Sequence, residues 1–381
     1  VSSPHATLES HMTITSPPAP QLRDGVEKIV GMEGLPLLHD TVSGTYHRVG
    51  DLASSIIDLF DGKRSSADIA SAVNARGLSA TPVRSAHVEA LARGLAKHQL
   101  MVGGVPQKRR RTGIDRMMPR FIISRGFARV LAPVVELVRP LYRPVPVALV
   151  VIVSLAGYAA GLCTIATHGL SRMAGNSPAQ LATVALLALV IQLVAILFHE
   201  SWHAIVCGLH GQPARGLGVA LLFWVMPVAY VDRTDAYRLR RRAPRVAIAL
   251  AGMVNDGWIM GVTSIVAATS GGTTHLVATT LLGYQLILLI ANLNPLAPSD
   301  TVGAIEAATG EIDLRGRART TIISALRGRR LPSYLSCCSR RRRTAYMVYG
   351  ALSYAFAAWI VLAVIWSIYH STEVIVQGVP S

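Results

Sequence analysis

The chain has 381 residues, which is enough for two or three ordinary domains. Hydrophobic residues make up 51% of it and charged residues only 15%, well below the usual share of about a quarter. This composition argues against an ordinary soluble protein and favours a membrane protein. The formal net charge of +16 would suit a nucleic-acid partner, but the basic residues cluster beside apolar runs and aromatic residues make up only 6%. We therefore expect no nucleic-acid binding.

The first 21 residues are rich in Ser, Pro and Thr, and this composition predicts a disordered leader. No secretory signal is expected, because the first strongly apolar run lies far inside the sequence. The cysteines form no CxxC pair and predict no disulfide framework. The sequence leaves open whether the vicinal pair Cys337 and Cys338, next to a basic cluster, is modified.

Residues 22–104 predict a small α+β domain. Two short strands are expected at 35–40 and 45–49, joined by a turn at 41–44. Three helices follow, and strands followed by three short helices are typical of a winged-helix-like unit. In the first helix, Asp51 is the expected cap, the sequence Asp61-Gly62 is the expected end, and one apolar face is made by Leu52, Ile56, Leu59 and Phe60. Ser65 or Ser66 is expected to cap the second helix. The third helix is expected from about Pro82 to Gln99.

Three short patterns in this domain occur in a characteristic order: Leu37–Asp40, then Ile56–Gly62, then Ile69-Ala70. With them the region resembles the PqqD-like family of peptide-recognition domains. The resemblance implies that the leader of a ribosomally made precursor peptide binds as an added strand on an exposed sheet edge. A helical regulatory or docking domain with no peptide groove is the alternative.

Five apolar runs in the rest of the chain are long enough to cross a bilayer core of about 30 Å. Before them, residues 105–146 form a basic linker with interleaved apolar residues, which predicts an amphipathic stretch on anionic lipid. The chain is therefore predicted to be a mainly α, multi-pass protein of the cell membrane. The expected spans are 147–167, 179–205, 244–269, 276–293 and 345–369.

The loops between the predicted spans differ sharply in charge. The loops at 101–146, 210–243 and 300–344 are heavily basic, whereas the opposite loops carry only Arg172. By the positive-inside rule, the N-terminal domain faces the cytoplasm and the C-terminus lies outside. The cytoplasmic end of the second span carries the most informative motif.

This motif is His199-Glu200-Ser201-Trp202-His203, an HExxH pattern at the end of a long apolar run. On a helix, the i and i+4 spacing places both imidazoles on one face, where they can hold one Zn²⁺. Glu200 then projects beside the metal and can take a proton from a bound water. The alternative is a helix with two hydrogen-bonded histidines, but polar residues at the end of an apolar helix are costly unless they serve a site.

A zinc hydrolase needs a third protein ligand, and Asp300 is the strongest candidate. Pro295 and Pro298 break the fourth span and can turn the chain so that Asp300 faces back into the bundle. By the charge-derived topology, Asp300 also ends on the cytoplasmic side, level with both histidines. The alternative is a helix-capping or loop aspartate.

HExxH together with NxxPxxxxD in separate spans resembles the site-2 protease family of intramembrane zinc metallopeptidases, over about residues 145–300. The resemblance implies that His199, His203 and Asp300 bind zinc and that Glu200 is the general base. It also implies that Asn292 positions the substrate or the oxyanion. Residues 223–232 are similar to the membrane-associated strand segment of that family, whose edge would hold the substrate.

Two positions depart from the family pattern. Thr301 stands where a glycine usually follows the aspartate, and Ala251–Asp256 replaces the usual AGPxxN, with Met253 for proline and Asp256 for asparagine. Asp256, or Asn255 beside it, is a candidate hydrogen-bond partner of a ligand histidine. No predicted ligand is missing, so activity is expected.

These expectations combine into one function. A leader-binding domain ahead of an intramembrane protease predicts leader removal from a ribosomally synthesised, modified peptide, with other maturation enzymes as further partners. One alternative is a regulatory protease that cuts a single-span signalling protein; another is an inactive peptide-binding scaffold or immunity protein. The predicted organisation is a leader (1–21), a peptide-binding domain (22–104), a linker (105–146), a protease core (147–300), a basic cytoplasmic loop (301–344), and a C-terminal span and tail (345–381). The oligomeric state and the role of the last span stay open.

Overall fold

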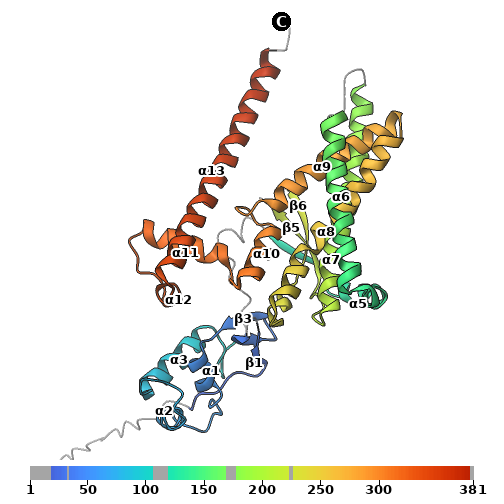
Figure 1. The fold of residues 1–381 in the computed structure, drawn as a ribbon. Helices are drawn as coiled ribbons and strands as arrows, with labels where there is room; N and C mark the ends of the chain where they lie inside the picture. Colours follow the sequence, from blue (N-terminus) through green and yellow to red (C-terminus); the bar gives the residue numbers. More distant parts are fainter. Residues whose placement is uncertain (1–18, 32–33, 106–118, 169–176, 223–225, 378–381) are drawn as a thin grey trace, which may run out of the picture. The chain divides into compact units, whose positions relative to one another are not determined.

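The structure is a computed structural model, and it describes residues 19–31, 34–105, 119–168, 177–222 and 226–377 (Figure 1). The chain is mainly helical and divides into two compact units. These are an N-terminal unit, Val1–Arg116, and a C-terminal unit, Met117–Ser381. Most of the predicted disordered leader (1–18), the basic run at 108–111 and Arg172 lie outside the described residues.

The N-terminal unit contains a three-stranded antiparallel sheet in the order β1-β2-β3, formed by Val26–Val30, Pro36–Asp40 and Thr45–Arg48. The two strands expected from the sequence are β2 and β3, and Gly44, with a φ of 71°, ends the turn between them. The sequence does not predict β1, because the adjacent polar residues Glu27 and Lys28 break the alternation that marks a strand.

Strand β2 is the central strand, and all five of its residues are buried. This position explains why the Leu37–Asp40 pattern contains two leucines. The carboxylate of Asp40 lies 2.8 Å from the guanidinium of Arg23. Burial raises the pKa of Asp40, but hydrogen bonds from Ser43 and Arg23 outweigh it and hold the pKa below its ordinary value.

Three helices, α1 (Asp51–Ile57), α2 (Ser66–Ala75) and α3 (Ser85–Lys97), complete this unit. Ser65, one of the two predicted candidates, caps α2, and it also forms a reciprocal capping box with Asp68. Asp51 is the first residue of α1, and the cap is Gly50. The prediction that Leu52 faces the core is wrong, because the inward face of α1 runs through Ala53, Ile56 and Ile57.

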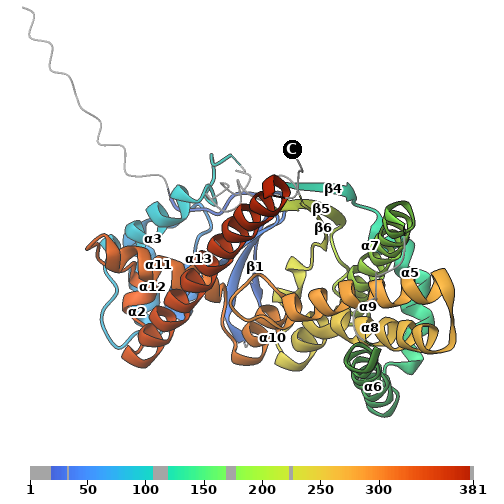
Figure 2. The same ribbon diagram turned by 90° about the horizontal axis from the view of Figure 1, so that it is seen from above.

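The C-terminal unit contains a second antiparallel sheet, in the order β4-β5-β6, formed by Arg120–Ser124, Leu217–Leu222 and Met226–Val231. Strand β4 lies within the predicted linker and was not foreseen there. Strand β6 is an edge strand and covers most of the predicted strand segment; residues 223–225 of that segment lie outside the described residues. Figure 2 shows the sheet beside α7, which contacts β6.

After β4 come a helix, α5 (Phe127–Val138), and a short 3₁₀ turn, η2 (Arg139–Leu141). Val135 of α5 packs against α7 at Gly208. The contact is close, because a Cβ added to Gly208 would lie only 2.9 Å from a methyl carbon of Val135. Val130 and Leu137 are exposed on α5. This amphipathic helix fits the apolar and basic pattern of the predicted linker.

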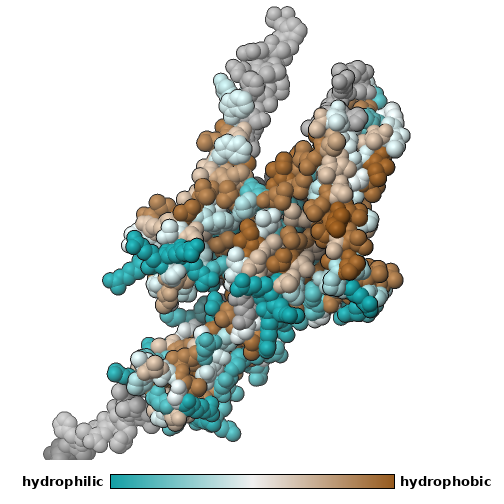
Figure 3. Space-filling view, viewed as in Figure 1, coloured by the Kyte–Doolittle hydropathy of each residue, from teal (hydrophilic) through white to brown (hydrophobic). Residues whose placement is uncertain are grey.

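Five helices are long and apolar enough to cross a membrane, in agreement with the sequence. They are α6 (Pro144–His168), α7 (Pro178–Leu209), α8 (Arg242–Thr269), α9 (Gly272–Leu293) and α13 (Arg340–Gln377). Their outer faces are apolar and exposed: on α7, for example, Leu186 and Phe198 are 62% and 55% exposed. In Figure 3, hydrophobic surface covers much of these helices, as expected for surface that faces lipid.

Helix α8 is the centre of the bundle, with contacts to α6, α7, α9 and α10. Glycines allow its close approach to α6, because a Cβ added to Gly157 would lie only 2.0 Å from the carbonyl oxygen of Gly257. Small residues at such crossings let membrane helices pack tightly. Several polar residues of α7, α8 and α9 are buried, among them Gln192, Thr263 and Gln285, while many of the large apolar residues of these helices are exposed.

The remaining elements are η3 (Thr234–Arg238), α10 (Asp300–Thr309), α11 (Leu314–Leu326) and α12 (Ser333–Ser336). η3 lies between β6 and α8, and the three helices α10, α11 and α12 connect α9 to α13. The hydroxyl of Tyr346, a buried residue of α13, donates to Glu311 (2.7 Å), and that of Tyr349 donates to the carbonyl of Pro295 (2.7 Å). The bond to Glu311 joins the base of α13 to the turn after α10, and the bond to Pro295 joins it to the segment that leads to Asp300.

Candidate metal centre

The HExxH motif lies on α7, as its spacing predicts. His199 and His203 occupy the same face, and both are buried, with 5% and 1% of their surface exposed. Their rings meet edge to face, with centroids 4.9 Å apart. The two Nε2 atoms lie 3.2 Å from each other, so both imidazoles present the same nitrogen to one point.

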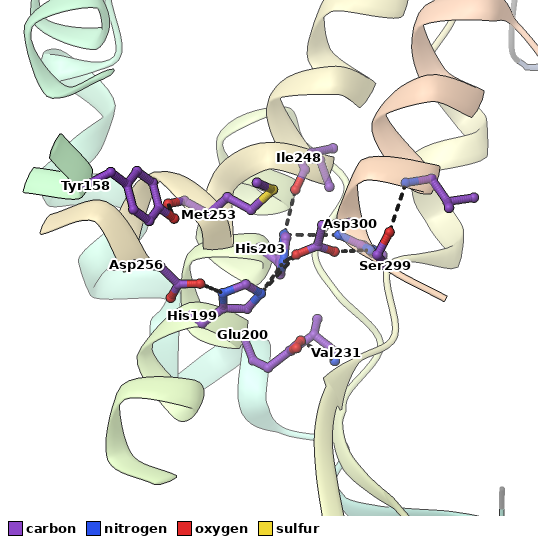
Figure 4. A network of polar contacts seen from close by, with 12 residues as sticks. Tyr158, His199, Glu200, His203, Val231, Ile248, Met253, Asp256, Ser299 and Asp300 are labelled. Carbon is purple, nitrogen blue, oxygen red and sulfur yellow. Dashed lines mark hydrogen bonds and ion pairs between the residues drawn. The ribbon is translucent and has the colours of Figure 1, made fainter. Parts of the chain in front are cut away.

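Asp300 reaches this point from a separate helix. Helix α9 ends at Leu293, and the chain turns where Asn294 accepts from the amide of Leu296 (2.9 Å). Ser299 then caps α10, so that Asp300 is its first residue. Asp300 is buried, and its Oδ2 lies 2.9 Å from His199 Nε2 and 3.0 Å from His203 Nε2 (Figure 4).

The three atoms, His199 Nε2, His203 Nε2 and Asp300 Oδ2, form a nearly regular triangle with sides of 2.9, 3.0 and 3.2 Å. Nitrogen and oxygen ligands about 2.0–2.1 Å from a tetrahedral Zn²⁺ lie about 3.3 Å from one another. Two imidazoles and one carboxylate, with a fourth position left open, are also the usual donor set of a catalytic zinc site. These residues therefore fit a zinc ion without rearrangement.

The other ring nitrogens are held by outer partners. His199 Nδ1 lies 2.8 Å from Oδ2 of Asp256, and His203 Nδ1 lies 2.6 Å from the carbonyl oxygen of Ile248. Both partners are acceptors, so with a metal ion at the centre each Nδ1 would carry the proton and each Nε2 would offer its lone pair to the metal. Such carboxylate and carbonyl partners orient metal-binding histidines.

Gly252 of α8 makes room for this arrangement. A Cβ added to Gly252 would lie 2.3 Å from Nε2 of His199, which is far inside van der Waals contact. The backbone of α8 thus passes directly beside the ring. Asn255 and Asp256 follow three and four residues later, about one turn along the same helix. Asp256, rather than Asn255, is the residue that reaches His199.

Arg233, directly after β6 and Asp232, was not predicted as part of the site. Its Nη2 donates to Oδ1 of Asp300 (2.8 Å), which leaves Oδ2 for the histidine side of the carboxylate. Its Nη1 lies 3.1 Å from His203 Nδ1, but that nitrogen already donates to Ile248. Burial raises the pKa of Asp300, yet His203, His199 and Arg233 together hold it well below the usual range, so this carboxylate is ionised.

Glu200 lies on the sheet side of the same helix turn. Its Oε2 accepts a hydrogen bond from the backbone amide of Val231, the last residue of β6, at 2.8 Å. One ligand atom each from Glu200, His199 and His203 lies within 4.8 Å of the others. The carboxylate is therefore placed between the histidine pair and the edge of β6.

Of the predicted site residues, the structure brings together His199, Glu200, His203 and Asp300. Asn292 lies half-buried in the last turn of α9. Among the described residues, no hydrogen bond joins the side chain of Asn292 to this cluster. Its predicted role in catalysis stays a prediction.

Family models, curated proteins and solved structures were all compared with the chain, and none matches. What this protein does is therefore inferred from its own residues and their geometry.

Proposed function

We propose that this protein is an intramembrane zinc metallopeptidase that cleaves a precursor peptide. The observation that carries the proposal is the triangle of His199 Nε2, His203 Nε2 and Asp300 Oδ2, with the carboxylate of Glu200 beside it. Its donors come from two separate helices at the ends of apolar spans. Polar groups at this depth are costly unless they line a hydrated functional site.

In this proposal His199, His203 and Asp300 hold the zinc ion. When bound, zinc supplies a Lewis acid for the scissile carbonyl and lowers the pKa of the attacking water. Glu200 accepts the proton of that water and passes it to the leaving amine. Asp256 and Ile248 keep the imidazoles oriented, and Arg233 keeps one oxygen of Asp300 away from the centre.

The free edge of β6 is the proposed place for the substrate backbone. Because the amide of Val231 points to Glu200, Val231 and, by alternation, Ala229 turn their backbone groups away from β5. Pro227 falls in the same outward register, where the lack of an N–H breaks no bond within the sheet. An extended substrate paired at Ala229 would run past Glu200 toward the histidines.

The substrate class is proposed from the two units together. Strand β3 is an edge strand of the N-terminal sheet in the described part of the chain, and the leader of a precursor peptide would add as a strand at this edge. By the positive-inside rule, the basic loops support a cytoplasmic position for both this unit and the metal centre. Tethering then raises the local concentration of the segment to be cut.

The test of the activity is cleavage of a membrane-associated precursor peptide by the full chain in proteoliposomes. We expect a product of peptide-bond cleavage. Its formation should stop when a chelator removes the zinc and should return when one equivalent of zinc is added. Binding of the peptide without any cleavage by the zinc-loaded chain would refute the proposal and favour a scaffold. Cleavage of a single-span protein that carries no leader would favour the signalling alternative.

The test of the substrate class is deletion of residues 22–104. We expect the deletion to raise KM for a precursor with its leader far more than for a short peptide without one, because only the former gains from tethering. The same precursor with a scrambled leader is the control. Equal changes in KM for both substrates would contradict leader capture.

A further inference from the structure

A small cavity lies inside the bundle and is lined by residues of α6, α7, α8 and α9. The polar residues that line it are Tyr158 of α6, Gln192 of α7, Asp256 of α8 and Gln285 of α9, among apolar side chains such as Met260 and Leu288. The volume open to the centre of a water-sized sphere is about 10 Å³, close to the minimum for one water molecule. Gln192 precedes His199 by seven residues, so the cavity extends about 10 Å deeper along the same face of α7.

Two oxygens at this cavity lack a partner. Gln192 and Gln285 are 6% and 7% exposed, and among the described residues neither Oε1 has a hydrogen bond. The orientation of Gln285 is fixed, because its Nε2 donates to Thr263 Oγ1 (3.0 Å), whose own proton goes to the carbonyl of Ile259 (2.8 Å). A buried acceptor left in this state costs free energy, and native structures usually satisfy it with a water.

The cavity offers acceptors and needs a donor. Besides the two glutamines its lining includes Asp256, whose Oδ2 is 2.8 Å from His199 Nδ1. The hydroxyl of Tyr158, which also lines the cavity, already donates to the carbonyl of Met253 (2.6 Å). The ligand must therefore be small and must present protons or positive charge to oxygen.

We propose that one ordered water molecule binds here and donates to Gln192 and Gln285 beside the Asp256 carboxylate. A water has two protons, which matches the two carboxamide oxygens that lack a partner. The site would make Gln192 and Gln285 positioning residues: they hold the water, the water limits the movement of Asp256, and Asp256 orients His199. This inference about His199 rests on the proposed metal centre, whereas the hydration site itself does not.

The first measurement is a high-resolution structure of the full, zinc-treated chain in lipid nanodiscs. We expect one density peak at hydrogen-bond distance, about 2.7–3.0 Å, from both carboxamide oxygens. The same preparation with choline replacing all sodium should keep the peak. A peak that disappears without sodium would identify a cation and overturn the assignment to water, and a cavity without density would overturn the site.

The second measurement is zinc affinity, by chelator competition, of Gln192→Met and Gln285→Met, which remove the carboxamides at similar volume. We expect each to bind zinc about 10-fold more weakly, as when outer partners of ligand histidines are lost. Thr279→Val is the control, because Thr279 is buried on α9 and its hydroxyl donates to the carbonyl of its own helix at His275 (2.9 Å). It should leave the affinity unchanged.

An empty cavity predicts a different result for the two Met variants. If no water is bound, each Met variant removes an unsatisfied buried oxygen, so its Tm should rise and its zinc affinity should equal that of the wild type. That result would overturn the inference alone. A wild-type chain that takes up no zinc would instead refute the metal centre, while the density at Gln192 and Gln285 would still decide the hydration site.

Discussion

Replacing Asp300 by alanine is expected to reduce zinc affinity by more than about 100-fold, because even loss of an outer partner costs about 10–100-fold. The change has two effects. It removes the third ligand atom, 2.9 and 3.0 Å from the two Nε2 atoms. It also leaves the guanidinium of Arg233, now without its carboxylate, 3.1 Å from the ring of His203. A cation there opposes the binding of Zn²⁺ at short range.

The measurement is zinc content after purification and equilibrium dialysis against a weak chelator. Glu306→Gln is a matched control in the same helix, since Glu306 accepts from the amide of Leu314 (2.7 Å), which a glutamine oxygen can also do. Adding Arg233→Gln to the Asp300→Ala variant should recover part of the lost affinity, because the unpaired charge is gone. Full zinc content in Asp300→Ala would show that Asp300 is not a ligand.

The sequence foretold the parts of this centre that depend on local spacing. HExxH fixes His199 and His203 on one helical face whatever surrounds them. Pro295 and Pro298 signal the end of α9. The five long apolar helices were also foreseen, because apolar runs of that length can be recognised from the sequence alone.

The parts that depend on tertiary contact could not be derived in the same way. Arg233 is one of many arginines in a basic loop, and only the turn after β6 aims it at Asp300. The segment that contains β4 has the sequence pattern of an amphipathic linker. It forms a strand because it pairs with β5, almost a hundred residues later, and local sequence does not reveal such pairing. Asp256 and Asn255 were both predicted as candidate partners of a ligand histidine, but only the packing of α8, which Gly252 permits, decides that Asp256 contacts His199.

The second large effect is expected for Glu200→Gln, which should lower kcat by about 10²–10⁴-fold while zinc content stays near that of the wild type. Glutamine keeps the size of the side chain and an oxygen that can accept from the amide of Val231, now bonded at 2.8 Å. It cannot take a proton from water. Because the link between α7 and the edge of β6 is preserved, KM should change little, and the loss should appear in single-turnover cleavage of the bound precursor.

Glu200→Ala separates the two roles of this carboxylate. It removes the proton acceptor and also the bond to Val231, so we expect the same loss in kcat together with a changed KM, if the β6 edge holds the substrate. Equal KM values in the Gln and Ala variants would place the substrate away from β6 and leave the proton-transfer role intact. Wild-type kcat in Glu200→Gln would mean that another group takes the proton. Val231 links the two outcomes, since its amide donates a hydrogen bond from the proposed substrate edge to the proposed base.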